Sequence, residues 1–316
     1  MSGKFVISLD FEKYWGVRDH KSISDYQENL DNVDLIVKRT LELFDMKKIH
    51  ATWAIVGFML FENKIQLIEM LDEIKQLYFD ISLNPYKYIE FNELIPKYHF
   101  SIQQIRQILC TPFQEIASHT FSHYYCLEEG QNIVDFKFDC DRFQEISKEF
   151  GINVKTIIFP RNQINTNYLD VLVENSIYAY RGTEEHPIYE ASSKQKNTML
   201  KRILRFLDRY INLTGHHTYK IDKSLKVINV KSSRFLAPYN KKLALLDMLR
   251  LNRIKKSMTY AAKNNQVFHL WWHPHNFGKN IEENFRFLNG IISHYQYLNS
   301  HYGFESKNIN EIVSEM

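Results

Sequence analysis

The sequence predicts an α/β protein built on a parallel sheet, which is either open or closed into a barrel. Short apolar runs that end in charged or polar residues alternate with longer segments of helical periodicity along most of the 316 residues. Buried parallel strands give continuous apolar runs of this kind, and each needs a crossover, usually a helix, before the next. No tract rich in proline, glycine or serine divides the chain, so we expect one domain over residues 1–316.

Seven segments have the length and apolar character of buried strands. The first, Phe5 to Leu9, leads into acidic residues, and the last, Val267 to Trp272, leads into histidines. The other five are residues 51–57, 113–117, 156–159, 177–181 and 227–235.

Segments of helical periodicity separate these strands. The amphipathic segment from Ile133 to Phe150 precedes Gly151, a residue that often ends a helix. The other predicted helices are residues 30–46, 60–77, 102–109, 168–175, 241–264 and 282–299. We expect residues 79–100 to be irregular, and we place an inserted region of helix and loop at about 182–260, where the first part is polar and weakly patterned.

The composition is that of an ordinary globular protein, with 44% hydrophobic and 24% charged residues. The net charge of +3 is too small to indicate a nucleic-acid partner. The run from Lys194 to Arg209 is basic and could meet an anionic ligand, although a solvated helix face is the simpler explanation.

Three further features of the sequence concern cysteine-based sites, membrane spans and the cellular location of the protein. Cys110, Cys126 and Cys140 have neither a disulfide pattern nor the close spacing of a cysteine zinc site. No apolar run approaches the roughly 20 residues that cross a bilayer. The chain enters its first predicted strand at Phe5, with no room for a signal peptide, so we expect a cytoplasmic protein.

Two histidines four residues apart, His119 and His123, follow the predicted strand at 113–117. On a helical turn such a pair directs both imidazoles to one side. Neutral imidazole is a common ligand of zinc-like ions, so the pair could supply half of a metal site. Because the chain contains 13 histidines, a close pair is also expected by chance.

Four polar segments lie at the carboxyl ends of predicted strands, where barrel enzymes place their active sites. They are Ser8–Glu12, His119–His123, Phe159–Gln163 and Leu270–Asn276. Together they supply the carboxylates and imidazoles that a metal-assisted hydrolase requires.

In order and spacing, these segments resemble the polysaccharide deacetylase family, which includes chitin, peptidoglycan and nodulation-factor deacetylases. Residues 51–57 (Ala-Thr-Trp-Ala-Ile-Val-Gly) and 115–123 (Glu-Ile-Ala-Ser-His-Thr-Phe-Ser-His) match the family pattern closely, and residues 159–162 and 270–273 match it loosely. The resemblance spans about residues 4–280 and covers residues 182–260 poorly. It implies a distorted, incomplete (β/α) barrel of about seven parallel strands.

The family's paired aspartates, a general base and a metal ligand, are replaced here by Asp10-Phe11-Glu12. Side chains alternate along an extended strand, so Asp10 and Glu12 point to the same side. The resemblance then implies Asp10 as the base and Glu12 as the third metal ligand beside His119 and His123. The reverse assignment, with Asp10 on the metal, stays open, as does an acid pair that simply faces water.

The resemblance assigns further roles on the same rim. His273 takes the position of the general acid, with a buried core imidazole as the alternative, and His275 could orient it or contact substrate. Arg161 could pair with the catalytic carboxylate, bind an anionic substrate or form a surface salt bridge. Arg181 ends a predicted strand and is a weaker candidate for contacting substrate.

Three tryptophans could stack on a sugar ring, namely Trp15, Trp271 and Trp272. Trp271 and Trp272 are adjacent in a predicted strand and must face opposite ways, so at least one of them belongs to the core.

The implied ligand set, two histidines and one carboxylate, leaves a position for water on a divalent metal. Zinc suits these ligands, and cobalt, nickel, manganese or iron would also fit. The leading prediction is a metal-dependent hydrolase that removes an N-acyl group, most simply acetyl, from a nucleotide-linked, lipid-linked or polymeric sugar in surface polysaccharide assembly. The alternatives are a metal amidohydrolase for a small ureide or formamide and an inactive carbohydrate-binding relative.

Overall fold

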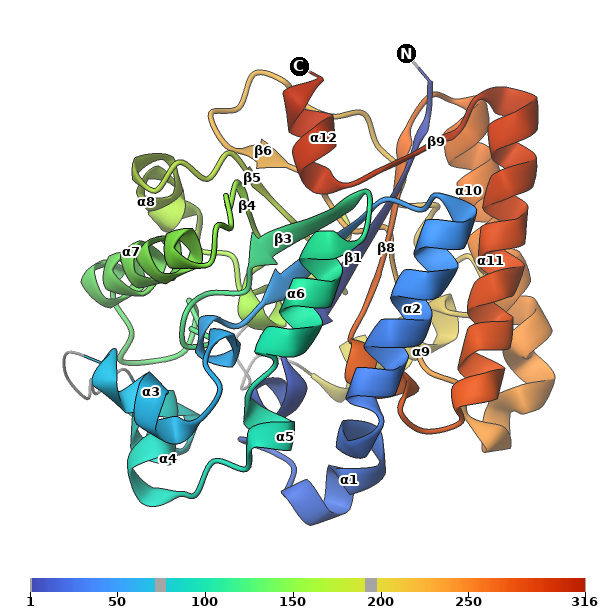
Figure 1. Cartoon of the computed structure of the whole chain (residues 1–316). Helices are drawn as coiled ribbons and strands as arrows, with labels where there is room; N and C mark the ends of the chain where they lie inside the picture. The colour runs from blue at the N-terminus through green and yellow to red at the C-terminus, as the bar shows by residue number, and fades with distance from the viewer. Residues whose placement is uncertain (1, 72–77, 191–197, 316) are drawn as a thin grey trace.

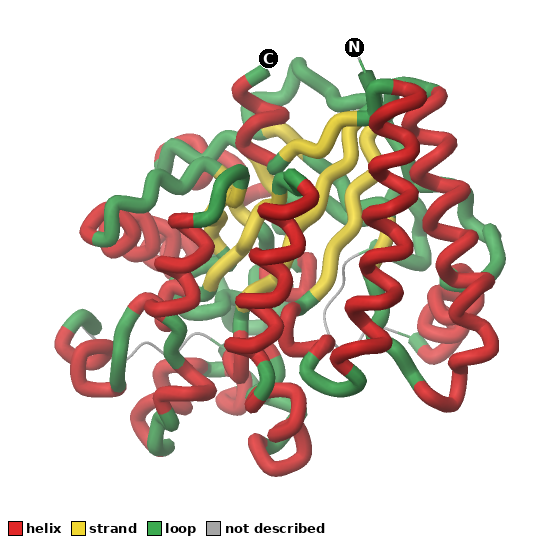
Figure 2. The backbone as a smooth tube through the Cα atoms, turned by 45° about the vertical axis from the view of Figure 1, so that its right-hand side comes forward, coloured by secondary structure: helices red, strands yellow, loops and turns green. Residues whose placement is uncertain are grey.

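The computed structural model describes residues 2–71, 78–190 and 198–315. Its centre is a curled sheet of eight parallel strands in the order β6-β5-β4-β3-β2-β1-β8-β7, and a further strand, β9, pairs with β1. Helices cover the outer face of this sheet (Figures 1 and 2). The predicted α/β class and incomplete barrel are therefore confirmed.

The strands begin and end close to the predicted positions. They are β1 (Lys4–Phe11), β2 (Ala51–Ile55), β3 (Gln114–Ser118), β4 (Thr156–Ile157), β5 (Ala179–Tyr180), β6 (Ile228–Asn229), β7 (Arg234–Phe235), β8 (Val267–Trp272) and β9 (Glu305–Lys307). The strand predicted at 227–235 is divided into β6 and β7, because β6 pairs with β5 while β7 pairs with β8. Strand β9 was not predicted.

The α-helices are α1 (Ile23–Asp31), α2 (Val33–Lys47), α3 (Lys64–Glu69), α4 (Pro85–Phe91), α5 (Pro96–His99), α6 (Ile102–Cys110), α7 (Ile133–Glu149), α8 (Leu169–Glu174), α9 (Met199–Asp208), α10 (Asp247–Lys263), α11 (Ile281–Tyr302) and α12 (Ile309–Ser314). The predicted helix at 60–77 is reduced to α3 within the described residues, and its segment 72–77 lies outside them. Helices α1 and α12 were not predicted, and the region expected to be irregular contains the short helices α4 and α5.

Strand β1 lies at the centre of the sheet and determines which side chains reach the barrel interior. It pairs with β8 on one side, and on the other with β9 through Lys4–Val6 and with β2 through Ser8–Phe11. Alternate residues pack under the helices in the main apolar core: Phe5, Ile7, Leu9 and Phe11. The intervening positions, Val6, Ser8 and Asp10, therefore face the interior.

Apolar side chains occupy much of the barrel interior from its amino-terminal end to the level of Asp10, which lies in register with Ala54. This cluster includes Val6, Ala54, Ala117 and Ala179, and Ile309 and Ile312 of α12 close it. In Figure 1, α12 lies at this end, while α1, α4 and α5 lie at the opposite end, where the strands finish. The four polar segments predicted to form the site lie at the carboxyl ends of the strands.

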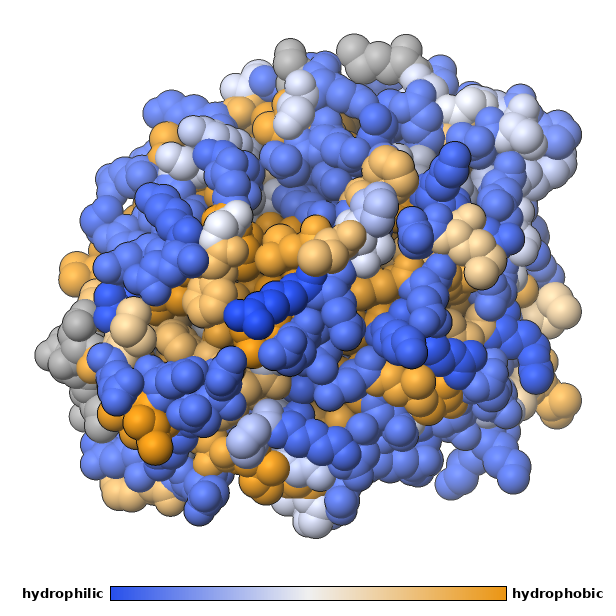
Figure 3. All heavy atoms as spheres, viewed as in Figure 1, coloured by the Kyte–Doolittle hydropathy of each residue, from blue (hydrophilic) through white to orange (hydrophobic). Residues whose placement is uncertain are grey.

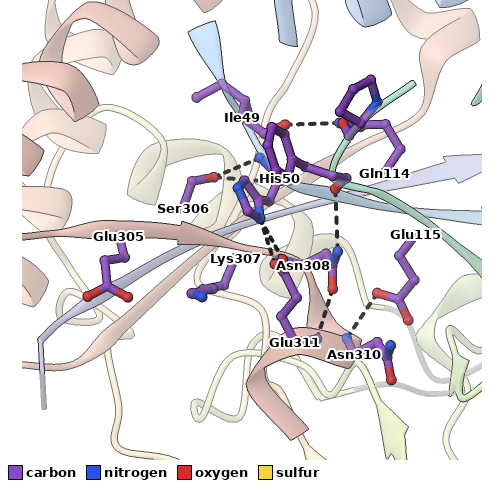
Figure 4. Close-up of polar contacts among 12 residues, drawn as sticks. Ile49, His50, Gln114, Glu115, Glu305, Ser306, Lys307, Asn308, Asn310 and Glu311 are labelled. Carbon is purple, nitrogen blue, oxygen red and sulfur yellow. Dashed lines mark hydrogen bonds and ion pairs between the residues drawn. The ribbon is translucent and has the colours of Figure 1, made fainter. Parts of the chain in front are cut away.

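A polar network joins the C-terminal segment to the sheet (Figure 4). Glu115 Oε2 accepts hydrogen bonds from Thr52 Oγ1 at 2.6 Å and Asn310 N at 3.0 Å, and Oε1 accepts one from Thr156 Oγ1 at 2.5 Å. Burial raises the pKa of Glu115 above its usual value even though these groups donate to it. Asn308 begins α12 with a capping box that includes Glu311.

The outer face seen in Figure 3 is largely hydrophilic, with apolar side chains showing between the polar ones. None of the helices in the described part of the chain is both long enough and apolar enough to cross a bilayer.

We expect Glu115→Ala to lower the free energy of unfolding by about 2–4 kcal/mol, because it leaves two hydroxyl groups and one backbone N–H without their acceptor. The measurement is denaturant unfolding at neutral pH. Glu129→Ala is the matched control, because Glu129 is exposed and its change should stay within about 0.5 kcal/mol. Equal stability of the two variants would show that α12 docks without the Glu115 carboxylate.

Candidate metal centre

Glu12, His119 and His123 converge where β1 and β3 end. Glu12 Oε2 lies 3.1 Å from His119 Nε2 and 2.9 Å from His123 Nε2. All three side chains are buried, and one potential ligand atom from each lies within 4.8 Å of the others. The structure therefore brings together the three residues that the sequence predicted as metal ligands.

The hydrogen bonds of His119 indicate that this cluster can hold a cation. His119 Nδ1 lies 2.8 Å from the carbonyl oxygen of Ile158, which can only accept a hydrogen bond. A neutral His119 therefore carries its proton on Nδ1 and presents the Nε2 lone pair to Glu12 Oε2. Two lone pairs at this distance need a proton or a cation between them, and a backbone-anchored imidazole is typical of metal ligands.

The loop that carries the two histidines is not the helical turn that their spacing allowed. Strand β3 ends at Ser118, and Thr120 and His123 have left-handed backbone conformations with φ of 63° and 61°. Asp139 on α7 fixes the loop, because its carboxylate accepts hydrogen bonds from Phe121 N at 2.5 Å and Ser122 N at 3.0 Å. Burial raises the pKa of Asp139 to about 6 despite these bonds.

Glu12 is held by the short 3-10 helix Lys13–Gly16 that follows β1. A Cβ atom at Gly16 would lie 1.9 Å from Glu12 Oε1, so only glycine leaves room for this carboxylate. Lys13 anchors the same turn by donating hydrogen bonds to the carbonyl oxygens of Lys97 and Phe100 at 2.9 Å each. The sequence reasoning missed Gly16, although its position four residues after Glu12 was visible.

The second carboxylate, Asp10, is bound by Arg181. The guanidinium donates from Nη1 to Asp10 Oδ1 at 2.6 Å and from Nη2 to Oδ2 at 2.8 Å, and both side chains are buried. Burial alone would raise the pKa of Asp10, but Arg181 lowers it below its usual value. Asn162 Oδ1 accepts a further bond from Arg181 Nη2 at 2.8 Å and holds the guanidinium in place.

The charges of the site also favour a cation. Burial would raise the pKa of Glu12, but the neighbouring imidazoles, with His273 the strongest, hold it well below the usual range. Asp10 and Glu12 bring two negative charges and Arg181 one positive charge, so one buried negative charge lacks a permanent partner. Burial, only partly opposed by Glu12, lowers the pKa of His123 to about 4, so this ring is neutral at pH 7 and able to bind a metal.

His273 lies across the opening from the two carboxylates. Its Nε2 is 3.4 Å from Glu12 Oε1 and 3.7 Å from Asp10 Oδ2, and 23% of its side chain is exposed. Asn276 Nδ2 lies 3.2 Å from His273 Nδ1 and can donate to it, which leaves the proton of a neutral His273 on Nε2. His275 is buried behind it, and Glu12, His273 and His275 form a second, more open set of potential ligands.

Arg161 does not pair with Asp10. Its guanidinium forms an ion pair with Asp19, lies 3.6 Å from Glu128 Oε1 and stacks 4.2 Å from the centre of the Tyr125 ring. The pairing that the sequence analysis considered for Arg161 is made by Arg181. Arg161 lies in the 3-10 turn Pro160–Asn162 beyond the end of β4, whereas Arg181 directly follows β5 and reaches Asp10 from there.

The structure corrects the placement of the predicted sugar-stacking tryptophans. Trp15 is fully buried and donates from Nε1 to the carbonyl oxygen of His99 at 2.7 Å. Trp272 is also fully buried, between Phe44 and Phe277 in the main core. Trp271 points to the interior instead, with its ring 4.2 Å from the guanidinium carbon of Arg181.

Next to this centre lies a cavity of about 1250 Å³, lined by Trp271 and His273 among other residues. The centre therefore has access to a space large enough for a sugar and for a group attached to it.

No family model matches the sequence, and no curated protein matches it. Solved structures share the fold at low identity. A protein assigned as a polysaccharide deacetylase from Mycobacterium smegmatis is 12% identical with a TM-score of 0.56, over 100% of this chain and 91% of its own. A GH57-type branching enzyme from Pyrococcus horikoshii is 12% identical with a TM-score of 0.55, over 100% of this chain and 70% of its own.

The allantoinase Puue also shares the fold, at 10% identity and a TM-score of 0.51, over 98% of this chain and 88% of its own. Such likenesses show a deacetylase-like fold, and the same fold carries several activities, so the function must be argued from the site.

We expect Gly16→Ala to weaken metal binding by about 10–100-fold, because the added methyl group displaces Glu12 from the two imidazoles. Titration of the purified protein with zinc against a chromophoric chelator measures the affinity, and circular dichroism checks the fold. The matched control is Gly290→Ala on α11, where the added Cβ meets only the Leu251 side chain, at 3.2 Å and beyond. Equal zinc affinity in both variants would mean that Glu12 does not contribute to the site.

Proposed function

We propose that this protein is a metal-dependent hydrolase that removes an N-acyl group, most simply acetyl, from a sugar. One observation carries the proposal: Glu12, His119 and His123 meet in a buried cluster, directly beside a second carboxylate that is locked to Arg181. The fold shared with the deacetylase from Mycobacterium smegmatis supports it. Zinc is the proposed metal, because it suits two imidazoles and one carboxylate.

The two carboxylates take different roles in this proposal. Glu12 contacts both imidazoles and would hold the metal with them, whereas Asp10 is turned towards Arg181 and is kept ionised by it. A divalent metal held there would acidify a water molecule and polarise the acyl carbonyl group. Asp10, as an ionised carboxylate at the same opening, would serve as the general base and take up a proton.

His273 would act as the general acid. Its Nε2 faces the opening between the two carboxylates, and Asn276 contacts the other ring nitrogen. A proton on Nε2 is therefore placed to be donated to the leaving amine. Tyr26 supports this arrangement, since its hydroxyl group donates to Asn276 Oδ1 at 3.0 Å.

A sugar is the preferred substrate class because of the cavity beside the centre. The cavity is larger than a small amide needs, and the half-buried Trp271 offers an aromatic ring at its edge. We further propose that the protein acts in the cytoplasm. Small amides such as ureides and formamides are the second candidate substrate class, and the fold shared with an allantoinase supports this class.

The test of the proposed function is hydrolysis by the zinc-loaded protein of N-acetylated sugars, N-formylated sugars and small ureido compounds in parallel. We expect amine release from the acylated sugars, and we expect His119→Ala and His123→Ala to lose both stoichiometric metal and hydrolysis. Release from the ureido compounds alone would favour the second candidate. Binding of zinc and sugar without hydrolysis of any of these compounds would contradict the proposed enzymatic function.

The roles of the two carboxylates are separated by Asp10→Asn and Glu12→Gln. We expect Asp10→Asn to reduce hydrolysis by about 10²–10⁴-fold while zinc content stays at the wild-type level, because general base catalysis contributes this much. Glu12→Gln should lose zinc as well as hydrolysis. Metal analysis of each purified variant, together with its rate, decides the assignment, and the opposite pattern would place Asp10 on the metal.

A further inference from the structure

The cavity beside the metal centre is lined by an unusual number of arginines. They come from the turn after β4, from α9 and from β7: Arg161, Arg202, Arg205, Arg209 and Arg234. Arg202 and Arg205 lie on α9 and Arg209 is its C-cap residue, and their spacing by three and four residues places them on one side of the helix. Three arginines of the basic run noted in the sequence thus line the cavity, and residues 194–197 of that run lie outside the described part of the chain.

Three acidic residues also line the cavity, and two of them have partners of their own. Asp19 is paired with Arg161 and His20, and Glu184 accepts a hydrogen bond from Ser232 at 2.9 Å. Glu190 is the remaining acidic lining residue. The wall formed by α9 and β7 therefore carries most of the positive charge.

Arg202 and Arg209 form no ion pair with any residue in the described ranges. Arg234 is paired with Asp208 at 2.6 Å, and 5% of its side chain is exposed. Its Nη2 has no hydrogen-bond partner among the described residues. A buried guanidinium nitrogen without an acceptor is costly unless a ligand supplies one.

Asp208 cannot neutralise this region by itself. The same carboxylate lies 3.7 Å from Arg253 Nη2 and accepts from Tyr189 and from the backbone N–H groups of residues 213 and 214. Burial, together with the neighbouring Arg234, lowers the pKa of Arg253 to about 10. One carboxylate therefore serves two guanidinium groups, and positive charge is left over next to the cavity.

We propose that this cavity binds a phosphate-bearing group, most simply a diphosphate, that is attached to the sugar whose amide reaches the metal centre. The guanidinium fork matches phosphate oxygens and binds them in pairs, and several forks on one wall suit a group with more than one negative charge. This inference rests on the proposed function, because Trp271 and His273 line the same cavity and connect it to the metal centre.

Two sources could supply this diphosphate, a nucleotide carrier or a polyprenyl lipid carrier. The arginine wall also contains Met199, Ile203 and Phe206, which line the cavity from the same helix. These apolar side chains could contact a lipid chain, so a lipid carrier should be tested as well as a nucleotide carrier.

The experiment is calorimetric titration of the full chain with inorganic pyrophosphate, in the zinc-loaded protein and in a His119→Ala/His123→Ala variant that cannot hold the metal. We expect binding in both proteins, and we expect Arg202→Gln/Arg209→Gln to weaken it by tenfold or more, since each charge-assisted bond contributes at least about that factor. Lys201→Gln is the matched control, because it removes a cation from α9 that does not line the cavity. Its affinity should stay within about twofold of wild type.

Several results would overturn the anion site. They are no binding of pyrophosphate, equal weakening by Lys201→Gln, and binding that needs zinc and ignores the arginines. Competition experiments with uridine diphosphate and with farnesyl diphosphate then identify the carrier. Tighter binding of the first indicates a nucleotide carrier, and tighter binding of the second indicates a lipid carrier. Hydrolysis of a simple N-acetylated sugar without pyrophosphate binding would refute the anion site alone, whereas arginine-dependent binding without any hydrolysis would refute the enzyme alone.

Discussion

Two carboxylates at the end of β1 are buried, and the residues around them must compensate for their loss of hydration. An isolated buried carboxylate costs several kcal/mol, so each must have a charged or hydrogen-bonding partner. Asp10 has Arg181, which is itself held by Asn162. Glu12 has only imidazole nitrogens, and one of these presents a lone pair rather than a proton. The difference between the two environments supports the proposal that Glu12 holds the cation and that Asp10 acts as the proton acceptor.

The loops around these carboxylates are held by groups that lie outside the site. Asp139 supplies the acceptors that stabilise the left-handed turn of His119–His123, and Lys13 ties the turn after Glu12 to two carbonyl oxygens. Several residues at these turns have positive φ without being glycine, a conformation that persists only where surrounding contacts enforce it. The geometry of the centre is therefore specified by α7 and by the excursion at residues 79–100 as much as by the ligands.

The strand pattern could be predicted from the sequence because it depends on local periodicity, whereas the proposed ligand set was implied by the resemblance to a known family. Alternation along β1 places Asp10 and Glu12 on one side, and the same rule on β8 places Trp271 inside and Trp272 in the core once Leu270 is known to be buried. The choice between Arg161 and Arg181 could not be predicted, since Arg161 lies in a turn with a left-handed backbone, φ 55°, that the sequence does not indicate, and it pairs there with Asp19. The conformation of the histidine loop depends on Asp139, sixteen residues beyond His123, and the spacing of the two histidines alone carries no information about it.

The fold is shared by proteins with different activities, so the part of the chain that selects a substrate must be sought away from the common strands. The metal centre is built from β1, β3 and β8, the segments in which the resemblance to deacetylases is found. The arginine wall is built from α9 and β7, within residues 182–260, where that resemblance is poor. A barrel of this kind can keep its chemistry at the strand ends and change its ligand through an insertion that opens onto the same space. In this chain α9 and β7 are basic where they line the cavity, which supports the proposal that the ligand is an anion and that the neutral amide is only one end of it.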